Sequence, residues 1–221
     1  MTVAWLKPAG AVACLVFFAA CAQVAIEAVT PMIAAFASHL DQRTASQITE
    51  LEKKSDWPGM LALARAQLAH EPGRADWWFL QGYALARQGE HAAAVESYQR
   101  AIRISPEDEM AWLALGASQS ALGQVERAIQ TYQQLLRNRP ESAQAYLVLA
   151  GAYQTQGRLD LAIANYRECV RYDPDSAPGW YGLAAAYQLN RQSERRDEAL
   201  QGLRRLAPAM ADQFEKQYPA K

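Results

Sequence analysis

"RYDPDSAPGW", residues 171–180, is the stretch of sequence that decides the fold. Its first proline, Pro174, separates two segments that are rich in alanine, leucine and aromatic residues. The proline recurs on a grid of 34 residues, since the same slot is filled by Pro72, Pro106, Pro140 and Pro208. A fixed period of this length indicates a chain built from repeated supersecondary units.

Other residues recur on the same grid when the chain is divided into the frames 75–108, 109–142, 143–176 and 177–210. The fourth place is aromatic in every frame: Trp78, Trp112, Tyr146 and Trp180. Three frames share glycine at the fifteenth place, alanine at the twentieth and tyrosine at the twenty-fourth: Gly89, Gly123 and Gly157; Ala94, Ala128 and Ala162; Tyr98, Tyr132 and Tyr166.

These landmarks predict two helices in each frame. Apolar residues recur with a helical period before the glycine and again between the alanine and the proline. Glycine adopts the positive φ that often follows a helix, and proline cannot continue the helix before it. The alanine allows the two helices to pack closely, and the tyrosine fills the space between one pair and the next. Pro174 therefore separates stacked helical hairpins, with turn and cap residues around it.

The pattern resembles the tetratricopeptide repeat (TPR), whose signature is W-x2-L-G-x2-Y followed by A-x3-F and P. "WLALG" at 112–116 and "AIQTY" at 128–132 carry its two halves almost literally. The resemblance implies an all-α, right-handed superhelical solenoid of stacked antiparallel helix pairs. The frames 75–108, 109–142 and 143–176 are its regular repeats.

Degenerate units are predicted on both sides of these repeats. Residues 41–74 keep Pro72, and Asp56 is placed to cap their second helix. Residues 177–210 have Arg191 at the glycine place and Arg196 at the alanine place, which suits the polar outer face of a terminal repeat. Residues 211–221 form a C-terminal cap or tail. Met210 and Phe214, four residues apart, would let a short last helix seal the end.

Residues 1–22, "MTVAWLKPAGAVACLVFFAACA", have the layout of a secretory signal or membrane anchor, and an apolar connecting segment, predicted helical, follows at 23–40. Three outcomes stay open. Cys21 is lipidated, although Phe18 stands where a lipobox usually has leucine; the chain is cleaved before Gln23; or residues 8–26 remain as a membrane helix. In each case Lys7 stays on the inner side of the membrane. The body is then expected on the periplasmic side of a bacterial cell envelope, most simply attached to the membrane.

Composition and motifs argue against several classes of function. A net charge of −1 gives no positive field for nucleic acid. The three cysteines and three histidines show no metal-ligand spacing, so neither a metal nor another cofactor is expected. No phosphate loop or nucleophile motif appears, and Cys169 falls at a small packing position where a thiol is inert. We therefore expect no enzyme and no small-molecule substrate.

The resemblance implies that the first helix of each pair lines a concave groove through its second, fifth, ninth and twelfth places. The candidate partner-binding residues are Asp76, Phe79, Tyr83, Met110, Leu113, Ala117, Ser120, Gln144, Leu147, Gly151, Gln154, Tyr181, Ala185 and Gln188. The fifth places form an apolar stripe, the ninth places are mostly small, and the twelfth offer hydroxyl and amide groups. The Lys, Arg and Asn clamp of the chaperone-binding members is missing.

This groove predicts a non-catalytic scaffold that binds an apolar helix or extended segment of a partner protein and helps assemble or stabilise an envelope complex. The alternative is a chaperone-like or regulatory subunit that modulates a partner enzyme. Residues 25–40, "AIEAVTPMIAAFASHL", are apolar enough to fill part of the groove themselves. The identity of the partner and the oligomeric state stay open from sequence.

Overall fold

The computed structural model describes residues 41–219, and within them the chain forms eleven helices and no strand. Their bounds are α2 Gln42–Lys53, α3 Trp57–His70, α4 Ala75–Arg87, α5 His91–Ile104, α6 Glu109–Ala121, α7 Val125–Asn138, α8 Ala143–Thr155, α9 Leu159–Tyr172, α10 Ala177–Leu189, α11 Ser193–Leu206 and α12 Pro208–Gln217. The predicted signal or anchor at 1–22 and the connecting segment at 23–40 lie outside the described residues. Between residues 41 and 219, none of the helices combines the length and the apolar character that a membrane crossing requires.

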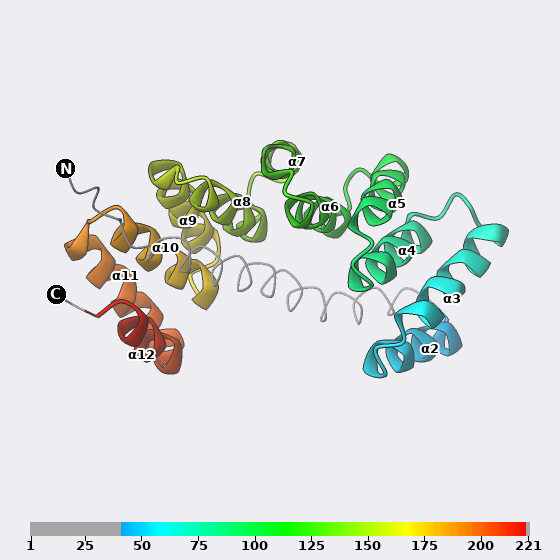
Figure 1. Ribbon diagram of the computed structural model, residues 1–221, viewed down its shortest axis with the longest axis horizontal. Coiled ribbons are helices and arrows are strands. Elements are labelled where there is room, and N and C mark those ends of the chain that lie inside the picture. Colours follow the sequence, from blue (N-terminus) through cyan, green and yellow to red (C-terminus); the bar gives the residue numbers. More distant parts are fainter. Residues whose placement is uncertain (1–40, 220–221) are drawn as a thin grey trace, which may run out of the picture.

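The helices from α2 to α11 form consecutive pairs, and the pairs stack into a curved row (Figure 1). Each helix packs against the one before and the one after it in the chain, and the first helices α4, α6, α8 and α10 also contact one another in series. In the middle of the row, α4 and α6 lie on the inner side of the curve, and α5 and α7 lie on the outer side (Figure 1). The predicted all-α solenoid of stacked helix pairs is confirmed.

The turn inside each regular repeat depends on its glycine. Gly89, Gly123 and Gly157 have φ values of 82°, 73° and 71°. This left-handed conformation is sterically unfavourable for residues with a Cβ but not for glycine. After α4, the amide of Glu90 donates to the carbonyl of Leu85 at 2.9 Å, which is the long hydrogen bond of a Schellman motif. The prediction that glycine ends the first helix is confirmed.

The contact between the two helices of a pair is made by the residues that recur on the grid. The alanines at the twentieth place are fully buried, and so are the three tyrosines at the twenty-fourth. Within the second repeat, the ring of Tyr132 lies so close to Gly116 that a Cβ there would come within 2.2 Å of the tyrosine Cε1. Tyr166 instead packs on Gly182 of the following pair, at a corresponding distance of 2.3 Å. The tyrosines thus fix spacing both within and between pairs.

The periodic proline and the periodic tryptophan are joined by a hydrogen bond. The indole Nε1 of Trp112 donates to the carbonyl oxygen of Pro106 at 2.8 Å. The same bond links Trp78 to Pro72 at 2.9 Å and Trp180 to Pro174 at 2.8 Å. The tryptophan therefore holds the turn before its own helix, because its indole N–H supplies the hydrogen-bond donor for the proline carbonyl in that turn. In the third repeat Tyr146 takes this place and stacks on Tyr172, with ring centroids 5.7 Å apart.

The two ends of the row are closed by the degenerate units. Asp56 caps α3 by accepting a hydrogen bond from the amide of Gly59 at 2.9 Å, as predicted. At the other end, α12 begins at Pro208, which suits the first turn of a helix, and its Phe214 is fully buried. Phe214 thus seals the end of the solenoid as the sequence predicted.

Candidate binding groove

The candidate groove residues lie on the first helices α4, α6, α8 and α10. The structure divides them by burial. Half-buried residues, which keep some exposed surface, are Asp76, Met110, Leu113, Ala117, Ser120, Gln144, Tyr181 and Gln188. Fully buried residues are Phe79, Tyr83, Leu147, Gly151, Gln154 and Ala185. The accessible groove is therefore a smaller set than the sequence pattern alone defined.

The N-terminal end of the groove is occupied by the degenerate first unit. The hydroxyl of Tyr83 donates to Glu52 Oε1 of α2 at 2.7 Å and accepts from Arg87 Nη1 at 2.9 Å. The guanidinium of Arg87 lies 4.1 Å from the ring centroid of Trp57, a cation–π contact. Burial, with the Glu52 carboxylate beside it, raises the pKa of Tyr83. Tyr83 thus fixes α4 to the first unit rather than facing solvent.

The C-terminal end is covered by α12. The hydroxyl of Tyr181 donates to Gln217 Oε1 at 2.9 Å, and the Tyr181 ring meets the Phe214 ring edge-on at 5.4 Å. Burial by these neighbours raises the pKa of Tyr181. An aromatic ring in such a contact contributes packing energy at this end of the row. The apolar stripe predicted at the fifth places is thus partly used by the protein itself.

The middle of the groove is formed by α6 and α8. Met110, Leu113, Ala117 and Ser120 of α6 are all half-buried. On α8, Gln154 is only 8% exposed, and its Oε1 is buried without a hydrogen-bond partner among the described residues. A buried amide oxygen without a donor costs about 1–3 kcal/mol, so this atom is a polar group of α8 that the contacts among the described residues leave unsatisfied.

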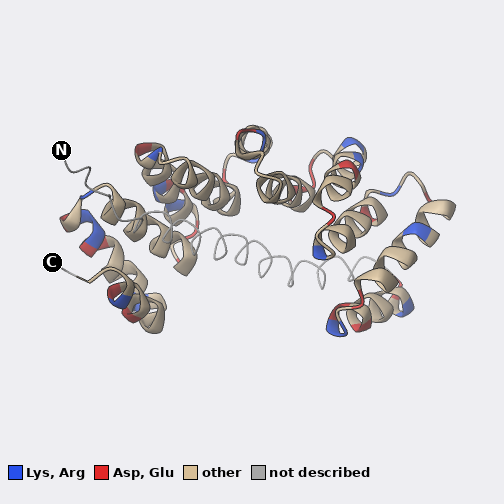
Figure 2. Cartoon of the chain, viewed as in Figure 1, with Lys and Arg blue, Asp and Glu red and all other residues tan. Residues whose placement is uncertain are grey.

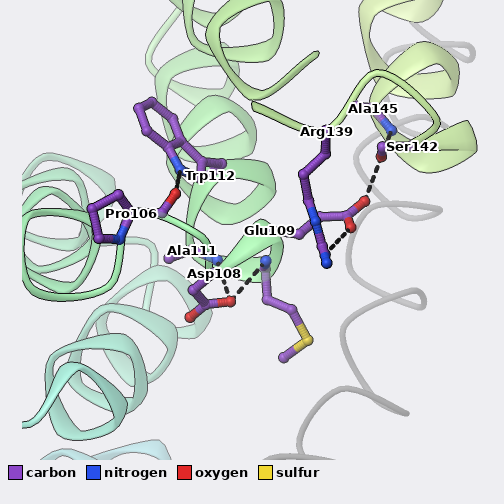
Figure 3. Close-up of polar contacts among 9 residues, drawn as sticks. Pro106, Asp108, Glu109, Ala111, Trp112, Arg139, Ser142 and Ala145 are labelled. Carbon is purple, nitrogen blue, oxygen red and sulfur yellow. Dashed lines mark hydrogen bonds and ion pairs between the residues drawn. The ribbon is translucent and has the colours of Figure 1, made fainter. Parts of the chain in front are cut away.

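A polar cluster at the repeat boundary sets the relative position of α6 and α8 (Figure 3). Asp108 caps α6 by accepting from the amide of Met110 at 2.9 Å. Glu109, the first residue of α6, accepts from Arg139 Nη1 at 2.8 Å and also from the hydroxyl of Ser142. Ser142 in turn caps α8 by accepting from the amide of Ala145 at 2.9 Å. The carboxylate of Glu109 is therefore engaged in holding two groove helices in register.

Charge is nearly absent from the candidate groove residues. Asp76 is the one charged residue among them, and Arg74 neutralises it with an ion pair of 2.8 Å. Over residues 41–219, charged side chains of both signs are spread along the whole row rather than gathered in one patch (Figure 2). The candidate groove residues are thus almost uncharged within a row of mixed charges.

No group of three His, Cys, Asp or Glu residues within 41–219 could hold a metal ion. Cys169 is buried beside Ser176, with Sγ and Oγ 3.8 Å apart, and burial raises its pKa to about 11. A thiol at that pKa is protonated at neutral pH and is a poor nucleophile. Its position thus agrees with the packing role predicted from sequence.

Together these features define a class of protein: a solenoid of helical hairpins whose first helices carry the largely uncharged candidate groove residues. Comparison with protein families then identifies the repeats. A model described as "Tetratricopeptide repeat" matches residues 113–177, and one described as "TPR repeat" matches residues 82–123. Residues 82–177 of the chain therefore match tetratricopeptide repeats, and such repeats generally serve as non-catalytic scaffolds for protein–protein interaction.

Solved structures show the same fold at low sequence identity. MamA from Desulfovibrio magneticus RS-1 is 20% identical, with a TM-score of 0.63 over 80% of this chain and 95% of that one. TTC0263, a thermophilic TPR protein of Thermus thermophilus, is 18% identical, with a TM-score of 0.60 over 77% of this chain and 92% of that one. Comparison with curated proteins gives no significant match.

Two features of the groove were missed by reasoning from the repeat pattern. The pattern treats all frames alike, so it did not place Glu52 against Tyr83 or Gln217 against Tyr181. A signal was present, because Glu52 occupies the twelfth place of frame 41–74, a groove place. Gln217 has no equivalent in any frame, and the sequence carried no sign of its contact.

Proposed function

We propose that the protein binds an apolar helix or extended segment of a partner in its concave groove. The observation that carries the proposal is the middle of the groove, where Met110, Leu113 and Ala117 keep exposed surface and no charged residue stands at a groove place. Ala117, the small ninth-place residue of α6, keeps exposed surface and lets a backbone approach closely, and the oxygen of the buried Gln154 amide lacks a partner among the described residues. A segment that brings apolar side chains and a hydrogen-bond donor would satisfy both features.

We further propose that this binding assembles or stabilises a complex in the cell envelope. The support is the sequence of residues 1–22, whose lysine and apolar run resemble a secretory signal, a lipoprotein signal with Cys21, or an uncleaved anchor. Mass spectrometry of the mature N-terminus tests this part directly. A diacylglyceryl group on Cys21, a free Gln23 and an intact Met1 in the membrane fraction are the three distinct outcomes. An intact Met1 on a chain that fractionates with the cytoplasm contradicts the proposal.

The binding proposal is tested by capturing partners from a detergent-solubilised envelope with the tagged full-length chain. Ser120→Lys places a charge in the uncharged middle of the groove, because Ser120 is a half-buried groove residue of α6. Ser46→Lys is the matched control, since Ser46 is exposed on α2 and is not at a groove place. The expected result is a partner that Ser46→Lys retains and Ser120→Lys loses. Equal capture by both variants contradicts binding in the groove.

The same experiment separates the scaffold from the alternative, a regulatory subunit. A stoichiometric complex of several proteins supports a scaffold, because stacked repeats present one continuous surface to its partners. Capture of a single enzyme at low occupancy, with a change in the activity of that enzyme, supports a regulatory subunit instead.

A further inference from the structure

We propose that the solenoid has a hinge at α7 and that Glu109 sets the angle of this hinge, and with it the width of the groove between α6 and α8. This inference rests on the proposed function, because the width of the groove matters only when a partner binds there. The apolar core supports the hinge. Its buried residues form two clusters, one built mainly on α2–α6 and the other mainly on α8–α12. Residues 41–219 thus form an N-terminal arm and a C-terminal arm, each with its own core.

Helix α7 is shared between the two arms. Its Leu135 belongs to the N-terminal cluster, whereas its Ala128 and Ile129 belong to the C-terminal one. Leu113 and Leu136 pack against both clusters, and both are only partly buried. Close packing resists bending inside each arm, because movement there opens voids or forces side chains together. Bending therefore costs least at α7, which lies at the crest of the curved row (Figure 1).

The contacts between α7 and α8 include polar pairs that water can replace. The side-chain amide of Gln133 donates to the hydroxyl of Tyr153 at 2.8 Å, and that of Gln156 donates to Glu126 Oε1 at 2.8 Å. Such hydrogen bonds exchange with bonds to water at a small net cost, unlike the exposure of apolar surface. These contacts therefore offer little resistance to a small rotation of α8 against α7.

Glu109 connects the two arms at one edge of the hinge (Figure 3). It is the first residue of α6, and its carboxylate accepts from the hydroxyl of Ser142, which caps α8, and from Arg139 Nη1 at 2.8 Å. Ser142 is buried, and its oxygen already accepts from the amide of Ala145 at 2.9 Å, so its single proton goes to Glu109. The carboxylate is thus the acceptor for both groups.

The connection depends on a residue that the repeat pattern does not require. The place of Glu109 holds alanine in the other three frames: Ala75, Ala143 and Ala177. An alanine side chain has no acceptor, so it cannot join neighbouring first helices in this way. The row therefore has this connection where its core divides.

The same connection lies beside the groove. Glu109 is followed by Met110, a half-buried groove residue of α6, and Ser142 is followed two residues later by Gln144, a half-buried groove residue of α8. A rotation of α6 against α8 therefore changes the separation between Met110 and Gln144. Glu109 does not stand at a groove place, so its role is to position the groove helices rather than to contact the partner.

Distance measurements between two spin labels in the full-length chain test the hinge without a partner. The labels are carried on p-acetylphenylalanine in place of Glu96 of α5 and Glu198 of α11, which are exposed and lie on opposite sides of α7. Glu109→Ala introduces the residue of the other frames and removes the acceptor of both Ser142 and Arg139. The expected result is a broader distance distribution at unchanged helical content by circular dichroism. A distribution identical to that of the wild type overturns the hinge.

Two further variants locate the effect. Asp160→Ala removes the bond from Asn190 Nδ2 to Asp160 Oδ1, 3.1 Å long, at the next repeat boundary, where both sides belong to the C-terminal cluster. This matched control should keep the wild-type distribution, and equal broadening by Asp160→Ala and Glu109→Ala overturns a hinge confined to α7. Arg139→Gln leaves the bond from Ser142 to Glu109 in place, so it should broaden the distribution less than Glu109→Ala does.

Partner capture links the hinge to the groove. Glu109→Ala should lower capture at least about twofold, the smaller end of what a residue outside a binding site contributes to coupling. Capture that Glu109→Ala leaves unchanged, while Ser120→Lys abolishes it, overturns the role of the hinge in binding and leaves the proposed function standing. Broadening by Glu109→Ala together with capture that Ser120→Lys does not change has the opposite meaning: the hinge stands and the proposed function falls.

Discussion

The central repeats and the terminal units form the same helical hairpin from different residues. In the central repeats the turn between the two helices uses Gly89, Gly123 or Gly157, all with positive φ. In the terminal units the equivalent places hold Ser55 and Arg191, and both adopt the same left-handed conformation, with φ values of 54° and 58°. The stacking geometry therefore imposes this turn even where the residue disfavours it.

The second difference lies in the packing between the helices. The twenty-fourth place is a buried tyrosine in the central repeats, whereas the terminal units have Ala64 and Leu200. Smaller side chains there leave less apolar area between the helices of a terminal pair. In a solenoid each unit is stabilised mainly by its neighbours, and a terminal unit has a neighbour on one side only. The terminal units should therefore open first, and the following predictions test where the stability resides.

The largest effect is expected for Tyr132→Ala, which gives a central repeat the alanine of the first unit. Tyr132 is buried, and its ring fills the space over Gly116. Removing a buried aromatic side chain costs about 3–5 kcal/mol, because apolar contacts are lost and a cavity remains. Urea denaturation followed by circular dichroism measures the loss. A loss below about 1 kcal/mol would mean that the repeat contact does not depend on the tyrosine.

Gly116→Ala tests the same contact, because the sign of its effect on the free energy of unfolding should depend on whether Tyr132 is present. In the wild type the new Cβ lies within 2.2 Å of the tyrosine ring, and overpacking costs about 1–3 kcal/mol. In the Tyr132→Ala background that ring is gone, and alanine stabilises a helix by about 1 kcal/mol over glycine. The double-mutant cycle should therefore give destabilisation in one background and stabilisation in the other. The same sign in both backgrounds contradicts the contact.

The packing and the turns were largely predictable from sequence, whereas the accessible part of the groove was not. The roles of Gly89, Ala94 and Tyr98 can be predicted from their residue types and their spacing. A left-handed turn favours glycine, and a close contact between two helices favours side chains of particular size. The repeat pattern also predicted which helices line the groove, and the candidate residues do lie on α4, α6, α8 and α10. It did not show that Tyr83 and Tyr181 are held by α2 and α12, because those contacts come from elements that depart from the repeat. The positive φ of Ser55 was not predicted either, because serine, unlike glycine, does not indicate a left-handed conformation.

Substitutions in the left-handed turns should have smaller effects on stability. Replacing glycine in a central repeat should destabilise the protein, and introducing glycine in a terminal unit should stabilise it. A Cβ at Gly123 meets no atom within 4 Å, so Gly123→Ala should cost only the strain of positive φ, roughly 1 kcal/mol. Arg191→Gly should remove the same strain and stabilise the last unit by about 0.5–1 kcal/mol, after the greater entropy of unfolded glycine is subtracted. Ser55→Gly should act alike in the first unit. Thermal denaturation of the three variants checks the opposite signs, and a stabilising Gly123→Ala contradicts the argument.

The smallest effect concerns the helix caps at the thirty-fourth place, where Asp108 stands in a position filled by Ser142 and Ser176 in the next two repeats. Burial raises the pKa of Asp108 above its ordinary value of 3.8, and this effect exceeds the opposing effect of the amides of Met110 and Ala111. The native state therefore binds the proton more tightly than the unfolded state does, so the stability contributed by this carboxyl is lost as pH rises through its native pKa.

Asp108→Ser keeps a capping oxygen and removes this titration. The variant should gain stability relative to the wild type between about pH 3 and about pH 7, a range that spans the ordinary titration of aspartate. Urea denaturation at several pH values measures the difference. If instead the free energy of unfolding of the wild type rises relative to that of Asp108→Ser as pH rises, the two amides, and not burial, dominate the electrostatics of this cap.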